Sequence, residues 1–137
     1  MPERKTLERA RKSRQEGKAP TTQAGEFVRE EMEHIREGKH GARSTKQAIL
    51  IGLSKARRAG VKLKPPKRGQ ASARTRKSAE RAYRAGQSGT RKKPSAKGSR
   101  STLRALKQEP KRAASRKALS KRARSAAAAR RRRRTAA

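Results

Sequence analysis

The chain contains no cysteine, no tryptophan and no aspartate, and it has one phenylalanine and one tyrosine among 137 residues. Without cysteine there is no disulfide scaffold, no thiolate metal site and no cysteine nucleophile. Without aspartate, the usual acid of a catalytic triad and most carboxylate metal patterns are missing. Because a globular domain normally carries far more large apolar side chains, this composition predicts a small core.

Long apolar runs are also missing. The longest run with large apolar side chains is Ala48–Ile51, whereas a membrane span needs about 18 apolar residues. The N-terminal "MPERKTLERARKSR" has no apolar stretch behind its basic residues, so it does not read as a secretory signal. Its Glu3 and Glu8 argue against an organellar transit peptide. We therefore expect a cytoplasmic protein without membrane association.

Acidic residues are scarce and unevenly placed. Lys and Arg number 43 against 10 acidic residues, which gives a formal net charge of +33. Residues 1–40 carry a net charge of +2, whereas residues 41–137 carry +31, with Glu80 and Glu109 as their acids. Such a block repels itself and needs a polyanion or extended solvation. Nucleic acid is therefore the expected partner.

The same composition predicts the fold class. Low hydrophobicity and high net charge are typical of chains that cannot offset their ordering entropy by burial. We expect a mainly α protein in which a small helical hairpin core precedes a long basic C-terminal half that is largely disordered or conditionally helical. The predicted divisions are a mixed-charge segment at 1–21, a two-helix core at 22–63 and a basic low-complexity region at 64–137.

The two core helices have clear sequence signals. Apolar residues at helical spacing predict a first helix over about 23–37. Ser44 followed by Gln47 forms a capping box that predicts the start of the second helix, and Gly60 predicts its end. Because one face of this second helix is rich in Gly and Ala, we expect the first helix to pack closely against it.

Two apolar residues of the second helix, Leu50 and Ile51, lie off that packing face. One interpretation packs them under the N-terminal segment or under Tyr83. The other makes them a second interface, and hence a homodimer through the 22–63 core.

The basic C-terminal half has weaker signals. Short helices are expected near 73–85, with Gly86 as a stop, near 101–109 and near 112–130, and residues 86–100 are expected to be flexible. In the last segment Ala, Lys and Arg favour a helix, but like charges four residues apart oppose it. We expect coil in free solution and helix once phosphates neutralise the charge.

No arrangement of residues indicates catalysis, so we expect neither an enzyme nor a cofactor. His34 and His40 can approach each other across Gly38, but a metal site would also need Glu33 or Glu37 as a ligand. The simpler interpretation is a pair of solvated histidines near a helix end.

Two groups of basic residues are candidates for binding nucleic acid. The first surrounds the second core helix and comprises Arg43, Lys46, Lys55, Arg57, Arg58, Lys62, Lys64, Lys67 and Arg68. The free N–H groups of residues 44–46, between Arg43 and Lys46, predict a phosphate site at the helix N-terminus, unless they are an ordinary solvated helix start. The second group lies in the C-terminal half and comprises Arg91, Lys92, Lys93, Arg130, Arg131, Arg132, Arg133 and Arg134. The five-Arg run also fits a nuclear import signal in a eukaryote.

The composition of residues 91–134 resembles the Lys/Ala/Ser/Pro tails of linker histones and bacterial histone-like proteins. Such tails bind by releasing counterions and carry little sequence information. The scarcity of aromatic residues argues against a stacking platform for RNA or single strands. We therefore expect sequence-independent binding and compaction of duplex DNA by a nucleoid-associated protein. The alternatives are an RNA- or ribosome-associated protein, an adaptor whose tail only localises it, and a protein that binds anionic lipid.

Residues 36–66, "REGKHGARSTKQAILIGLSKARRAGVKLKPP", resemble a family of small, basic, uncharacterised bacterial proteins. That family has a core like "KQAIAIGLSEARRAG" followed by a Pro/Lys segment. Here Leu50 stands where the family tends to have Ala, and Lys55 stands where it tends to have Glu. The change at position 55 removes an acidic partner for nearby Arg residues. The resemblance implies a bacterial protein of undetermined activity that is presumed to bind DNA, and it adds no catalytic residue.

Overall fold

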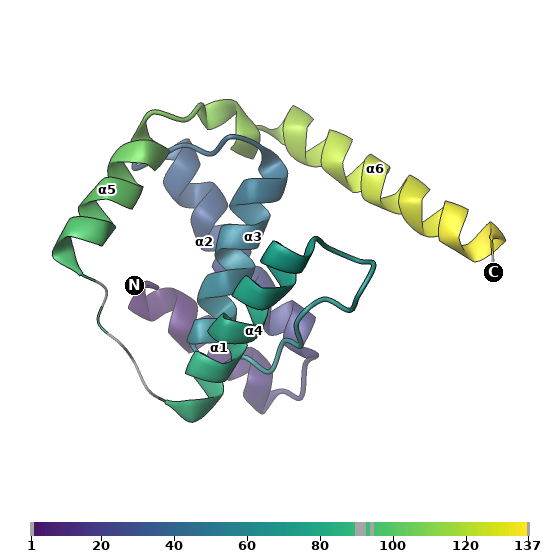
Figure 1. The fold of residues 1–137 in the computed structure, drawn as a ribbon, viewed down its shortest axis with the longest axis horizontal. Helices are drawn as coiled ribbons and strands as arrows, with labels where there is room; N and C mark the ends of the chain where they lie inside the picture. The colour runs from purple at the N-terminus through teal and green to yellow at the C-terminus, as the bar shows by residue number, and fades with distance from the viewer. Residues whose placement is uncertain (1, 90–92, 94, 137) are drawn as a thin grey trace. The chain divides into compact units, whose positions relative to one another are not determined.

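The structure is a computed structural model, and it describes residues 2–89, 93 and 95–136. The regular elements are α1 (Arg4–Gln15), α2 (Pro20–Arg36), α3 (Thr45–Arg58), α4 (Ala73–Ser88), α5 (Ala96–Lys107), the 3-10 helix η1 (Lys111–Ala114) and α6 (Arg116–Thr135) (Figure 1). The mainly α class is therefore confirmed.

The expected disorder of the C-terminal half is wrong. Residues 111–135 form η1 and α6, and α5 begins at Ala96, inside the segment expected to be flexible. The Ser115 hydroxyl caps α6 by accepting the Ala118 N–H at 3.1 Å. Intrinsic helix propensity and this cap outweigh the repulsion between like charges that favoured a coil.

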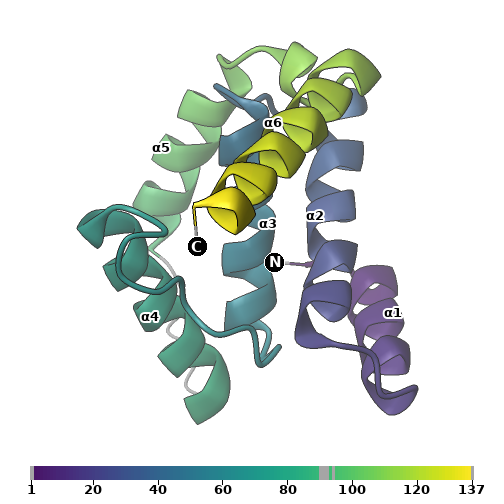
Figure 2. The same ribbon diagram turned by 90° about the vertical axis from the view of Figure 1, so that its right-hand side faces the viewer.

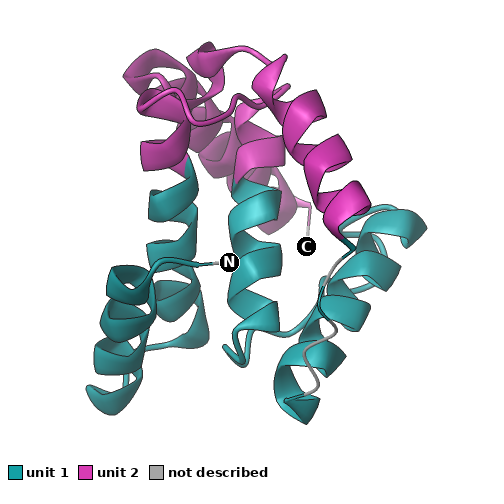
Figure 3. Cartoon of the chain, turned by 90° about the vertical axis from the view of Figure 1, so that its left-hand side faces the viewer, with its two compact units in different colours: residues 1–31, 49–95 teal, residues 32–48, 96–137 magenta. Residues whose placement is uncertain are grey.

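The chain divides into two compact units, coloured in Figure 3. Unit 1 contains residues 1–31 and 49–95, and unit 2 contains residues 32–48 and 96–137. Helices α2 and α3 each contribute residues to both units.

Unit 1 contains a small apolar core. Figure 2 shows α1 alongside the N-terminal part of α2, and the Glu3 N–H donates to the Glu30 carboxylate at 2.6 Å between these helices. The buried core residues are Ala10, Ala24, Phe27, Ala56 and Val61, with Leu7, Leu53, Ala59 and Leu63 packed against them. Most of these side chains are small, so the core depends on close backbone contact rather than on bulky residues.

Glycine allows that close contact in unit 1. A Cβ on Gly52 of α3 would lie 2.7 Å from the Val28 Cα of α2, which confirms the predicted close packing of the two helices. A Cβ on Gly86 would overlap the Arg57 carbonyl oxygen. Gly86 is therefore not the predicted helix stop: α4 runs through it to Ser88 and ends at Gly89, which has a left-handed φ of 69°.

The starts of α2 and α3 follow local chemistry. Helix α2 begins at Pro20, three residues before the predicted start, because the first turn of a helix does not need the N–H that proline lacks. At α3 the Gln47 N–H donates to Ser44 Oγ at 3.1 Å, and Gln47 Oε1 accepts the Arg43 N–H at 2.6 Å. The predicted capping box is therefore present, with one difference. The Gln47 side chain accepts the N–H of Arg43, whereas in a standard capping box it would accept the N–H of the cap residue itself.

Within the described ranges, none of the helices is long and apolar enough to cross a bilayer.

Candidate nucleic-acid interface

In unit 2 the turn between α2 and α3 holds the segment that follows α5. The Gly41 N–H donates to the Leu106 carbonyl at 2.7 Å, and the Ala42 N–H donates to the Pro110 carbonyl at 3.1 Å. A Cβ on Gly41 would overlap the Glu109 carbonyl oxygen, so the two backbones meet at a distance that only glycine permits.

Two side chains complete this attachment. The Thr45 hydroxyl donates to the Ala113 carbonyl at 2.5 Å, and Arg36 Nε donates to the Ala114 carbonyl at 3.0 Å. Ala113 and Ala114 are themselves buried. Because residues 113 and 114 directly precede the cap of α6, these bonds bring the start of α6 next to the start of α3.

A pocket of about 350 Å³ lies where these two helix starts meet. Its walls come from the start of α3 and from η1 and the first turns of α6, and they comprise Arg43, Ser44, Thr45, Arg112, Ala113, Ser115, Lys117, Ala118 and Lys121. The four cationic residues in this set are all exposed, and none of the described lining residues carries a carboxylate. We call this the basic pocket.

The two helices begin in the same way at the basic pocket. Ser44 caps α3 and Ser115 caps α6, each accepting the N–H three residues later at 3.1 Å. The N–H groups of the first turn have no carbonyl acceptor within their own helix. The basic pocket therefore combines the partial positive charges of two helix N-termini with the charges of four basic side chains. This combination favours the binding of a phosphate group.

The sequence predicted only part of this pocket. Arg43 lines it, and Lys46 is exposed on the same first turn of α3. Arg112, Lys117 and Lys121 were not among the candidate residues. A signal was available, because Ser115 before "RKAL" is a typical N-cap, but nothing local to residues 112–121 indicates that they lie beside Arg43.

Two of the predicted binding residues have internal partners in unit 1. The Lys55 ammonium pairs with the carboxylate of Glu31, whose side chain is fully buried. Arg57 is buried and donates through Nε to the Leu63 carbonyl at 3.1 Å, and burial lowers the pKa of its guanidinium. Both side chains therefore stabilise the unit itself.

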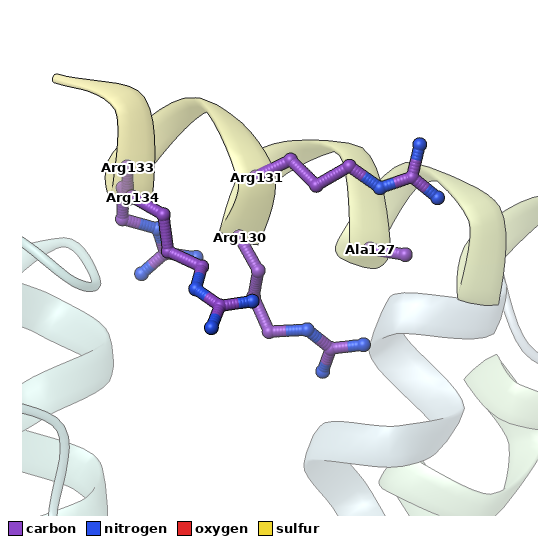
Figure 4. Close-up of a pocket in the computed structure, with 5 residues that line it drawn as sticks. All are labelled: Ala127, Arg130, Arg131, Arg133 and Arg134. Atoms are coloured by element: carbon purple, nitrogen blue, oxygen red, sulfur yellow. The ribbon is translucent and has the colours of Figure 1, made fainter.

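The other predicted residues are more accessible. Five of the predicted residues in unit 1 have exposed side chains: Arg58, Lys62, Lys64, Lys67 and Arg68. Lys93 is also exposed, whereas Arg91 and Lys92 lie outside the described residues. In unit 2 all five residues from Arg130 to Arg134 are exposed, and four of them line a shallow hollow with Ala127 on α6 (Figure 4).

The two histidines approach each other as predicted. Their rings meet edge to face with centroids 6.2 Å apart. His40 is buried and His34 is half-buried, so the expectation of two solvated histidines is wrong. Nδ1 of His40 lies 2.9 Å from the Gly41 carbonyl oxygen.

No curated protein and no solved structure matches the chain significantly. Residues 4–68 match the model of a family of unknown function (DUF6496), a range that spans α1 to α3 and is consistent with the expected likeness to an uncharacterised family.

Proposed function

We propose that this protein is a non-enzymatic, sequence-independent DNA-binding protein that compacts DNA as part of a bacterial nucleoid. The observation that carries the proposal is the basic pocket, where four exposed cations and two helix starts converge without a carboxylate in the described lining. Backbone phosphate is the group that satisfies such a site, and it repeats along any duplex regardless of sequence.

The distribution of charge supports the same function. Residues 41–137 carry a net charge of +31, and each unit has its own exposed cations. A protein with two cationic surfaces can bridge two DNA segments, which is how compaction is achieved. The resemblance of residues 46–60 to a "KQAIAIGLSEARRAG" core of small basic bacterial proteins supports a bacterial setting.

The test is duplex DNA binding across a salt series with the full chain and two charge-matched variants. The pocket variant carries Arg43→Gln, Arg112→Gln, Lys117→Gln and Lys121→Gln. The control variant carries Arg4→Gln, Lys5→Gln, Arg11→Gln and Lys12→Gln, all at exposed positions of α1. Each variant loses four positive charges, so a difference between them reports position rather than net charge.

We expect the unmodified chain to bind duplexes of unrelated sequence equally, with a steep dependence of affinity on salt. The pocket variant should reduce the slope of log K against log salt by about 3 to 4, because each lost phosphate contact removes about 0.9. The control should change it by less than about 1. Equal losses in both variants would contradict the role of the pocket. Absence of binding at low salt would overturn the proposal and favour the adaptor function, and stronger binding of a structured RNA would favour the RNA-associated function.

A further inference from the structure

Helix α6 has the properties of an independent binding element. It contains 20 residues, from Arg116 to Thr135, and none of them is buried. At 1.5 Å per residue it is a rod of about 30 Å. Half of its residues are Arg or Lys, and none is acidic.

The cations of α6 surround the helix axis. Successive residues are 100° apart around a helix, so the run from Arg130 to Arg134 places guanidinium groups on every side. Figure 4 shows Arg131 on one side of the helix and Arg130 and Arg134 on another. The cations interrupt every face of the helix, and Leu119 is its one large apolar side chain, whereas a bilayer surface or a groove on a protein would require a continuous apolar face.

The middle of α6 is narrow. Four consecutive alanines, Ala126–Ala129, separate the basic first half from the Arg130–Arg134 run. Small side chains at the centre let the helix backbone approach a partner closely, while long basic side chains at both ends reach outward.

We propose that α6 lies in the major groove of B-form DNA, with its alanine-rich middle against the groove floor and its basic ends on the phosphates of both walls. This inference rests on the proposed DNA-binding function. A helix with side chains is about 10–12 Å wide, and the major groove is about 12 Å wide and has phosphates along both sides. The major groove of A-form RNA is too deep and narrow to admit the helix. Duplex DNA is therefore the polyanion whose shape matches a helix that is cationic all round.

The experiment uses the full chain and two versions of one DNA duplex. The first version has ordinary cytosine, and the second has glucosylated 5-hydroxymethylcytosine, whose uncharged sugar obstructs the major groove and leaves the phosphates unchanged. An RNA duplex of the same sequence and the minor-groove ligand netropsin complete the set. The variant is Ala127→Pro, which breaks the helix at its centre without changing any charge, and Ala127→Ser is its control.

We expect the unmodified chain to bind the glucosylated duplex and the RNA duplex on the order of tenfold more weakly than ordinary DNA, the loss expected when one set of groove contacts is removed. Ala127→Pro should bind ordinary DNA as weakly as the glucosylated duplex, because the broken helix no longer fits the groove. Ala127→Ser should bind like the unmodified chain. Because no residue of α6 is buried, the rest of the protein should keep its fold in both variants.

The outcomes separate this inference from the proposed function. Equal binding of both DNA duplexes, with no effect of Ala127→Pro, would overturn the major-groove placement and leave DNA binding intact. Displacement by netropsin, or RNA binding as tight as DNA binding, would also overturn it. Absence of binding to every duplex would overturn both proposals.

Discussion

Replacing Gly41 with alanine tests how the basic pocket is assembled. Gly41 is not among the described glycines with positive φ, so alanine costs nothing in backbone conformation at this position. The cost is steric, because the new Cβ would overlap the Glu109 carbonyl oxygen and would lie 2.8 Å from the Pro110 carbonyl oxygen. Both obstacles are backbone atoms, which cannot rotate away as a side chain can.

The expected loss of stability is compared with the free energy of the hydrogen bonds that join residues 36–45 to residues 106–114. Four hydrogen bonds link these segments, and at about 1 kcal/mol each they contribute about 4 kcal/mol to their attachment. Overpacking by one methyl group costs about 1–3 kcal/mol. We expect Gly41→Ala to weaken the attachment by about 2 kcal/mol, which is roughly a thirtyfold rise in the detached population.

Amide hydrogen exchange measures this effect directly. The Ala42 N–H, which donates to the Pro110 carbonyl, should exchange about thirtyfold faster in Gly41→Ala. The Val61 N–H, which donates to the Ala56 carbonyl in unit 1, should not change. The matched control is Gly25→Ala, since nothing lies within 4 Å of a Cβ at Gly25. Unchanged protection of Ala42, or equal loss of protection at Val61, would refute the reasoning. DNA binding should weaken in parallel, because detachment separates Arg112 from Arg43.

Two further substitutions test the packing of unit 1. Gly52→Ala gains helix propensity but places its Cβ against the Val28 backbone, so it should lower the free energy of unfolding by about 1–2 kcal/mol, whereas Gly25→Ala should raise it by about 0.5–1 kcal/mol. Equal effects of the two in urea unfolding followed by circular dichroism would contradict the close contact of α2 and α3. Lys55→Met leaves the buried Glu31 carboxylate without this partner and should cost about 3–5 kcal/mol, whereas Lys46→Met, at an exposed position of the same helix, should change stability by less than about 0.5 kcal/mol. A loss under about 1 kcal/mol for Lys55→Met would contradict a structural role for the pair.

The parts of the fold that sequence could predict depend on neighbouring residues. The Ser44–Gln47 cap and the left-handed Gly60 lie within a few positions of the helix end that each one marks, so α3 was bounded correctly. Gly86 has the same local appearance as a helix stop. Its actual role depends on the Arg57 carbonyl, 29 positions away in the chain, and no local pattern contains that contact.

The same distinction explains the candidate site. Arg43 and the helix N-terminus beside it were visible in the sequence. The basic pocket was not, because its other half comes from η1 and α6, a segment that was expected to be coil until phosphates neutralise its charge. The amino-acid composition of residues 106–121 gives their net charge. It cannot predict the hydrogen bonds that Gly41, Ala42 and Thr45 donate to this segment.

The attachment at Gly41 also limits how far this protein can be divided. The family match ends at residue 68, yet the backbone amides of Gly41 and Ala42 find their acceptors at residues 106 and 110. A fusion or truncation that kept residues 4–68 alone would leave both amides and the Thr45 hydroxyl to bond with water, and it would uncover Ala42. Residues 4–68 are therefore a poor choice for a transferable module, and a portable version of the α2–α3 turn has to include the chain through Ala114.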